Sequence, residues 1–138
     1  MVGIVGYSIY QSTIYITYRG TANFENIYED IQFTQVPFGA RNPIPCNNCY
    51  SHAGFLDCHT ATLAGIWKGF LDLQKTYPTF QVVVTGWSLG GAVASLMAVD
   101  MSVGNLYKNN CIYIVFGHIY NSVSHICSVN LLQHPCRC

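Results

Sequence analysis

Short apolar stretches rich in β-branched and aromatic residues open the chain. They read VGIVGYSI at 2–9 and TIYITY at 13–18, with a polar break at Gln11-Ser12 between them. Residues of these types are enriched in strands, and a break of this length suits a tight connection. We therefore expect a hairpin, or two neighbouring strands, over residues 2–18.

Helical periodicity follows in two segments. Residues 23–31 predict a short helix that Asn23 can cap, because apolar side chains recur at i, i+3, i+4 and i+7. Residues 54–77 predict a longer helix that Pro78 ends. Its apolar stripe consists of Leu63, Trp67, Phe70, Leu73 and Tyr77. Between the two segments, residues 34–51 are rich in proline and are expected to be loop.

Two continuous apolar runs complete the pattern, FQVVVTG at 80–86 and CIYIVFG at 111–117. Such runs are typical of strands buried on both faces of a mostly parallel sheet. Residues 88–103 lie between them and predict a helix whose small residues allow close packing. The alternation of helix and strand predicts an α/β fold with a mostly parallel sheet flanked by helices. Residues 118–138 show no periodicity of this kind.

Composition narrows the classes of function. Of 138 residues, 51% are hydrophobic and 9% charged, with six basic residues balancing six acidic ones, so the chain can bury a core and has no basic patch for nucleic acid. No apolar stretch approaches the roughly 20 residues of a membrane span. The first residues lack the pattern of a secretory signal, and the sequence assigns no compartment.

Seven cysteines raise the question of a metal or redox site. CNNC at 46–49 has metal-ligand spacing, and the terminal CRC, His52 or His59 could add ligands. We favour buried thiols or a disulfide over zinc, and the sequence indicates no metal and no cofactor.

One serine stands between glycines where the strand at 80–86 gives way to a helix. The segment GWSLGG at 86–91 fits G-x-S-x-G, and strand, turn and helix follow in the order that a nucleophile elbow requires. Such a turn presents the Ser88 hydroxyl at the carboxyl edge of the sheet, beside the Leu89 N–H at a helix N-terminus. The alternative is that Ser88 merely caps the helix. The context favours a nucleophile.

Three segments resemble the class 3 (fungal-type) lipase family. VTGWSLGGAVASLMAVDM at 84–101 is similar to V-T-G-H-S-L-G-G-A-x-A, and SHAGF at 51–55 to H-x-G-F. IYITYRGTANFENIYEDI at 14–31 resembles the family's strand, R-G-T/S and N-W-x-x-D-L. Their order and rough spacing match over residues 2–117. The resemblance implies a partial α/β-hydrolase fold and the hydrolysis of acylglycerols or related lipid esters.

The resemblance also implies roles for single residues. Ser88 matches the nucleophile, while Thr21 and Leu89 match the two donors of the oxyanion hole. His52 matches a histidine that is not the catalytic base, and we expect it to be structural. The helix at 23–31 lies where a lid begins in members that have one. Its apolar face would meet substrate or pack on the core, and both interpretations stay open.

Two departures from the family pattern concern the catalytic machinery. Trp87 replaces the usual histidine before the nucleophile, a position that supports the elbow. A serine hydrolase of this fold also needs an acid and a base in the order Ser, Asp, His. After Ser88 the only acidic residue is Asp100, about 18 Å down the same helix, too far to orient a base at Ser88.

Three histidines could substitute for the missing base, namely His118, His125 and His134. The alternative is that each is an ordinary tail or loop histidine. His118 is the best placed, because it follows a strand expected beside the elbow strand. The family's F-G-x-P-R pattern stops after Phe116-Gly117. We therefore expect residues 1–117 to form a truncated lipase-like core and 118–138 a tail of unassigned structure, as a retained intron or shifted frame would produce.

Three hypotheses of function follow. The first is a lipid-ester hydrolase that uses Ser88, acting on its substrate at a membrane or droplet surface. The second is a non-catalytic, lipase-like remnant that binds lipid or a protein partner. The third, a cysteine-rich metal module, ranks last because the buried strands describe a hydrolase sheet. A sheet without its later strands would leave apolar surface uncovered, so we also expect association or aggregation.

Overall fold

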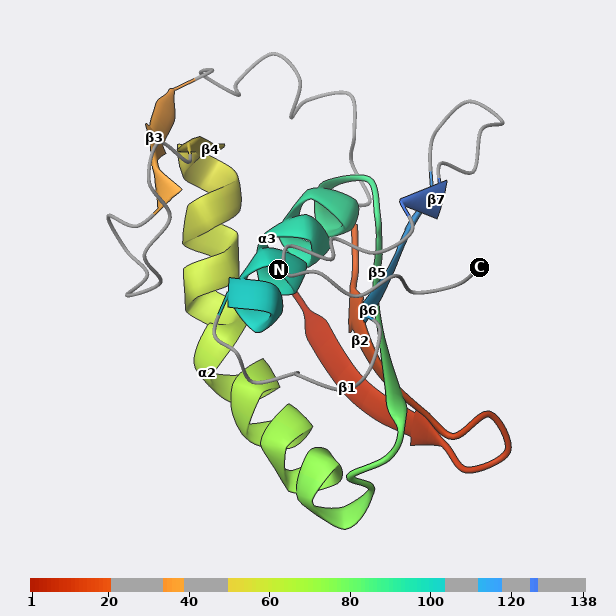
Figure 1. The fold of residues 1–138 in the computed structure, drawn as a ribbon. Coiled ribbons are helices and arrows are strands. Elements are labelled where there is room, and N and C mark those ends of the chain that lie inside the picture. Colours follow the sequence, from red (N-terminus) through yellow and green to blue (C-terminus); the bar gives the residue numbers. More distant parts are fainter. Residues whose placement is uncertain (21–33, 39–49, 104–111, 118–124, 127–138) are drawn as a thin grey trace.

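A five-stranded sheet forms the centre of the molecule. The computed structural model describes residues 1–20, 34–38, 50–103, 112–117 and 125–126. The sheet has the strand order β1-β2-β5-β6-β7 (Figure 1). Its strands are β1 (Gly3–Ser8), β2 (Thr13–Tyr18), β5 (Gln81–Trp87), β6 (Ile112–Gly117) and β7 (His125–Ile126).

The sheet is parallel at its centre and antiparallel at both edges. β2, β5 and β6 run parallel, whereas β1 pairs with β2, and β7 with β6, in the antiparallel sense. The predicted hairpin at the start of the chain is confirmed as β1 and β2. Two helices join the strands, α2 (Ala53–Thr76) and α3 (Leu89–Val103). The predicted α/β class with a mostly parallel core is thus confirmed.

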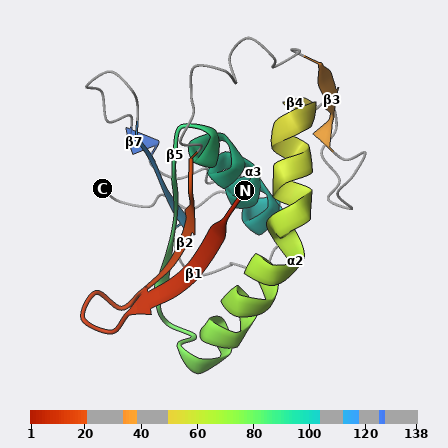
Figure 2. The ribbon, with the colours of Figure 1, turned by 180° about the vertical axis from the view of Figure 1, so that it is seen from behind.

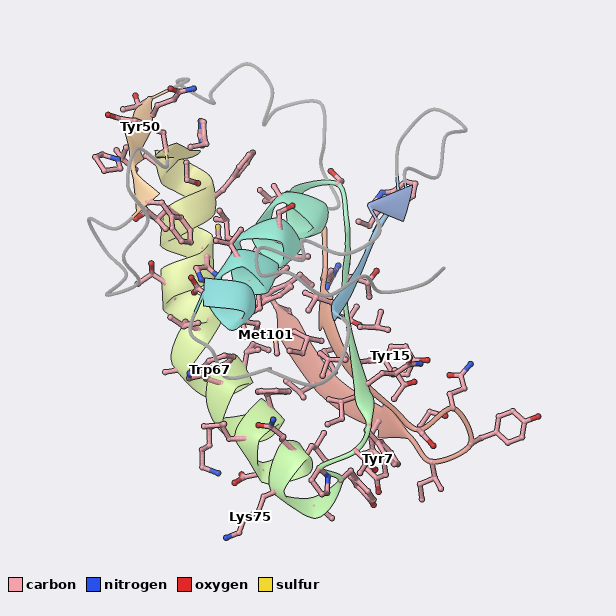
Figure 3. The ribbon with its side chains drawn as sticks, in the orientation of Figure 1. Tyr7, Tyr15, Tyr50, Trp67, Lys75 and Met101 are labelled. Atoms are coloured by element: carbon pink, nitrogen blue, oxygen red, sulfur yellow. The ribbon has the colours of Figure 1, made fainter. Side chains whose placement is uncertain are left out.

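Both helices pack on the same face of the sheet (Figures 1 and 2). The register places Ile14, Ile16, Val82 and Val84 on this face, and all four are buried against α2 and α3. Figure 3 shows Trp67 of α2 and Met101 of α3 near the contact between the two helices. The expectation that the strand at 80–86 is buried on both faces is therefore too strong. Val83 points to the other face and is only half-buried.

The helix predicted over 54–77 starts one residue earlier and ends one residue earlier. His52 caps α2, because its Nδ1 accepts a hydrogen bond of 3.2 Å from the Gly54 N–H, and its ring contacts Phe55. This cap gives a physical reason for the H-x-G-F pattern. At the other end Tyr77 donates its backbone N–H to the Leu73 carbonyl, just before Pro78.

The expectation of an unbroken loop over 34–51 is wrong at its two ends. β3 (Gln35–Pro37) and β4 (Tyr50–His52) pair as a small antiparallel sheet beside the start of α2. Pro37 lacks an N–H and occupies the end of β3, where a missing donor disturbs pairing least. Strands of three residues are too short to show period-two alternation, so proline content dominated the prediction.

Candidate active site

The turn between β5 and α3 holds a serine in an unusual backbone conformation. Ser88 has φ 56°, and Ser12 is the other non-glycine residue with positive φ in the described part of the chain. This left-handed region costs an L-residue with a Cβ atom roughly 1–2 kcal/mol. Strain of this kind persists where the surrounding structure enforces it, often at functional sites. Ser12 lies in the exposed β1–β2 turn, whereas Ser88 lies between the central strand and a helix.

The glycines around Ser88 allow three backbone segments to meet closely. A Cβ atom on Gly86 would overlap the Gly90 carbonyl and lie 2.7 Å from the Gly91 nitrogen. A Cβ atom on Gly90 would overlap the carbonyl of Tyr18, the last residue of β2. The spacing G-x-S-x-G thus has a steric origin here. Each glycine lies at a contact where no side chain fits.

The helix begins at Leu89, directly after the serine. The Ser88 carbonyl accepts hydrogen bonds from the Gly91 N–H at 2.8 Å and the Ala92 N–H at 3.3 Å. The N–H groups of Leu89 and Gly90 have no acceptor within the helix, because they belong to its first turn. No acidic residue occupies that turn, so nothing on it offsets the positive end of the helix dipole. The Leu89 N–H is therefore suited to stabilise negative charge beside Ser88.

The segment that leads to Thr21 runs against this turn. A Cβ atom on Gly20 would lie 2.6 Å from the Trp87 carbonyl oxygen, so the chain leaves β2 beside the residue before the serine. Thr21, the predicted first oxyanion donor, lies outside the described residues, as do the predicted helix at 23–31 and CNNC at 46–49. The contact at Gly20 explains the glycine of the R-G-T pattern.

The Ser88 hydroxyl is covered in this structure. Its Oγ atom is buried and makes no hydrogen bond to a described residue, although the residue as a whole is only half-buried. A substrate can reach the oxygen only after the covering atoms move. In contrast, the adjoining Trp87 side chain is 53% exposed.

An acid and a base do pair among the described residues, but away from Ser88. His59 Nε2 and Asp100 Oδ2 are 2.6 Å apart, and both side chains are buried between α2 and α3. Asp100 lies about 18 Å along α3 from Ser88 at 1.5 Å per residue. Asp100 is therefore too far from Ser88 to orient a base there, as the sequence predicts. His118 and His134 lie outside the described residues, and of His125 only the backbone in β7 is described.

The His59–Asp100 pair was missed in the sequence. Its partners are 41 residues apart, and His59 was considered there only as a zinc ligand. One pattern could have revealed it, since His59 precedes Leu63 by four positions and so extends the apolar stripe of the helix. A polar residue on a buried stripe requires a polar partner.

Within the described residues no three metal-ligating side chains gather, and neither helix has the length and apolar character needed to cross a bilayer.

Tyr18 joins this buried polar cluster. Burial raises the pKa of the Tyr18 phenol, the Thr62 hydroxyl offsets part of the rise, and the negative charge of Asp100 adds to it. Thr62 is close enough to favour the phenolate slightly but completes no hydrogen bond of ordinary geometry with it. The folded state thus favours the neutral phenol.

This shift predicts an alkaline loss of stability that Tyr18→Phe should reduce. The folded protein keeps the phenol proton at a pH where the unfolded chain loses it, so the stabilisation is complete below about pH 10 and decreases above it. Above about pH 10 the free energy of unfolding is expected to fall by about 1.4 kcal/mol per pH unit. Urea unfolding at pH 9 and 11 would measure it. Tyr10→Phe, at a residue 96% exposed, should keep the wild-type slope, and an equal slope in Tyr18→Phe would contradict the prediction.

A family model and several relatives match this chain. The model for Lipase (class 3) matches residues 15–118. A lipase of Rhizomucor miehei is 37% identical over 91 residues, which are 66% of this chain and 24% of the relative. A secreted mono- and diacylglycerol lipase 2 of Gibberella zeae is 30% identical over 120 residues, 78% of this chain and 29% of the relative. The chain thus spans about a quarter of the length of these curated relatives.

Solved lipase structures share the arrangement of strands and helices. The lipase from Rhizopus microsporus var. chinensis superposes with a TM-score of 0.71 at 34% identity, over 81% of this chain and 38% of that one. A triacylglycerol lipase described as having a serine protease triad at its catalytic centre gives 0.68 at 34% identity, over 75% of this chain and 37% of that one. The predicted partial α/β-hydrolase fold is confirmed. The chain belongs to the class 3 lipase family.

Proposed function

We propose that the protein is a lipid-ester hydrolase whose nucleophile is Ser88. The observation that carries the proposal is the left-handed conformation of Ser88 at a turn where Gly86 and Gly90 admit no side chain. A serine that only capped a helix would adopt extended backbone there at no cost. The strain is intelligible if the hydroxyl must project from the edge of the sheet toward a reacting carbonyl.

The proposed reaction proceeds by acyl transfer. The Ser88 Oγ attacks the ester carbonyl carbon while its proton passes to a base, and the Leu89 N–H stabilises the oxyanion of the tetrahedral intermediate. The ester C–O bond then breaks, and the alcohol leaves with the proton. Water attacks the acyl-enzyme in the same manner and releases the fatty acid. Thr21 is proposed as the second oxyanion donor, since the adjoining Gly20 lies against the turn.

The base for this reaction is proposed to be His118. Gly117 pairs with Trp87 in the register of β6 and β5, so the chain leaves β6 level with the residue before the nucleophile. His118 is next in the sequence. His59 is unsuitable because it is buried against Asp100, remote from Ser88. In this proposal residues 1–117 form the hydrolase core and 118–138 the tail.

The proposed substrate is an acylglycerol ester at a lipid–water surface, either a membrane or a droplet. One relative is described as a secreted mono- and diacylglycerol lipase, and one solved neighbour as a triacylglycerol lipase. The 9% of charged residues in this chain also suits contact with an apolar substrate. Two preferences can be measured by hydrolysis of p-nitrophenyl esters. Esters of increasing acyl length would give the preference for acyl chains, and assays with and without vesicles of neutral phospholipid would give the preference for a lipid surface.

A fluorophosphonate probe tests the nucleophile directly. The folded wild-type chain should form one covalent adduct, on the tryptic peptide that contains Ser88, and the urea-unfolded chain should form none. Ser95 is the internal control, because its Oγ donates to the Gly91 carbonyl at 3.1 Å and it should stay unmodified. An unlabelled Ser88 in a chain shown to be folded would exclude an activated nucleophile.

One observation favours a second candidate, a non-catalytic remnant that binds lipid or a protein partner. The Ser88 Oγ is covered and contacts no base among the described residues. In this alternative the chain floats with lipid droplets or vesicles although Ser88 stays unlabelled. Ester turnover that disappears in Ser88→Ala would exclude it.

A further inference from the structure

We propose that His59, Asp100 and Tyr18 form a polar anchor that positions the nucleophile turn. This inference rests on the proposed function, because it assigns positioning residues to the reaction at Ser88. The anchor lies among α2, α3 and the end of β2. None of its three residues touches the reacting atoms, and each would act through the backbone elements that meet around Ser88.

The buried His59–Asp100 pair is a costly way to hold two helices together. His59 and Asp100 are buried amid an apolar contact that includes Ile66, Phe70 and Met97. Taking such groups out of water costs free energy that their hydrogen bond only partly offsets, so apolar residues of similar volume often hold a fold equally well. A directional hydrogen bond of 2.6 Å adds geometry, since it fixes how far α3 can slide or rotate against α2.

Two buried polar atoms of the cluster lack a hydrogen-bond partner among the described residues. Nε2 of His59 faces Asp100 Oδ2 at 2.6 Å, and Nδ1 is the other polar atom of the ring. Neither this Nδ1 nor the Tyr18 hydroxyl, both buried, has a hydrogen-bond partner among the described residues. Each such group lowers stability. A cluster selected only for stability would have these atoms paired or replaced by apolar groups.

The anchor is connected to the nucleophile turn through α3 and β2. α3 is an unbroken helix from Leu89 to Val103, so it can transmit a shift of Asp100 along the helix axis to the Leu89 N–H. Tyr18 provides a second connection. Its side chain lies within the electrostatic reach of Asp100, while its backbone pairs with Gly86 and its carbonyl fits against Gly90. The anchor therefore connects to both glycines of the turn.

A volume-matched apolar replacement separates positioning from stability. In His59→Leu/Asp100→Ala the summed side-chain volume stays close to that of the native pair, and the urea midpoint should be unchanged or raised. The rate of fluorophosphonate labelling at Ser88 should fall about tenfold or more, since small displacements at a reacting centre cost factors of this size. Met97→Leu, a volume-conserving change on the same helix, should keep the wild-type rate.

Amide hydrogen exchange gives a readout that does not need a reactive serine. The Gly91 N–H is bonded to the Ser88 carbonyl, and the Val84 N–H in β5 reports on opening of the sheet. The proposal expects exchange at Gly91 to accelerate about tenfold relative to Val84 in the double variant. A role in global stability alone would change both amides together and leave their ratio constant.

The outcomes distinguish the anchor from the proposed function. An unlabelled wild-type Ser88 with an altered Gly91-to-Val84 ratio would overturn the hydrolase and support the anchor. Wild-type labelling and a wild-type ratio in the double variant would overturn the anchor. Should the double variant fail to fold, Asp100→Asn replaces it, because asparagine keeps the shape and one acceptor oxygen. An unchanged ratio of exchange at Gly91 and Val84 in that variant would overturn the anchor.

Discussion

Replacing Ser88 with glycine is expected to abolish fluorophosphonate labelling and to stabilise the fold. Labelling ends because the variant lacks Oγ. Stability rises for two reasons, relief of a left-handed backbone at φ 56° and removal of a buried hydroxyl without a described partner. Ser88→Ala separates these effects, since it removes the hydroxyl and keeps the strain. In urea unfolding, the free energy of unfolding should rise by about 1 kcal/mol in Ser88→Ala. It should rise by about 0.5–1 kcal/mol more in Ser88→Gly.

Ser12 supplies the matched control for that experiment. It has φ 49° in the exposed β1–β2 turn, where its backbone bonds with Ile9 and Gln81 do not require a side chain. Ser12→Gly should gain about 0.5–1 kcal/mol and keep full labelling at Ser88. A Ser88→Gly variant less stable than the wild type would show that the turn is unstrained. Labelling that persists in Ser88→Ala would place the nucleophile elsewhere.

The expected gain has a functional meaning. A glycine would satisfy the geometry of this connection at lower free energy. Retention of a strained serine at the end of the central strand is intelligible when the hydroxyl reacts. The strain at Ser12 has a simpler origin, because a tight turn between antiparallel strands requires positive φ.

The parts of the fold that were predictable from sequence depend on local chemistry. β1, β2 and β5 consist of β-branched and aromatic runs, α2 follows an apolar stripe, and the nucleophile turn is marked by its glycines. Each pattern reports on contacts that neighbouring residues make with one face of a strand or helix. Such periodicities do not depend on how remote parts of the chain fold.

The parts that were missed depend on remote partners. Val36 and Ser51 pair across the β3–β4 ladder although proline dominates the sequence around them. His59 and Asp100 meet only because α2 and α3 cross on one face of the sheet.

The sequence pattern also places apolar residues on the opposite face of the sheet, but it does not indicate which part of the chain covers them. Ile4 lies there and is 61% exposed, so the expected association of this chain stays a prediction for light scattering.

The largest loss of stability is expected for Gly86→Ala. The added methyl group would overlap the Gly90 carbonyl and approach the Gly91 nitrogen to 2.7 Å, and both are backbone atoms that no rotamer change can move. Relief would require β5 and the start of α3 to separate at the nucleophile turn. We expect a loss of about 3 kcal/mol or more, a large share of the roughly 5–15 kcal/mol that holds a domain together.

Gly65→Ala is the matched control, with the opposite sign. Gly65 is exposed in the middle of α2, and a Cβ atom there meets no neighbour within 4 Å. Alanine should stabilise the helix by about 0.5–1 kcal/mol. Urea midpoints of the two variants should therefore shift in opposite directions from the wild type. A Gly86→Ala variant as stable as Gly65→Ala would mean that β5 and α3 do not meet at the nucleophile turn, and the steric origin proposed for G-x-S-x-G would be wrong.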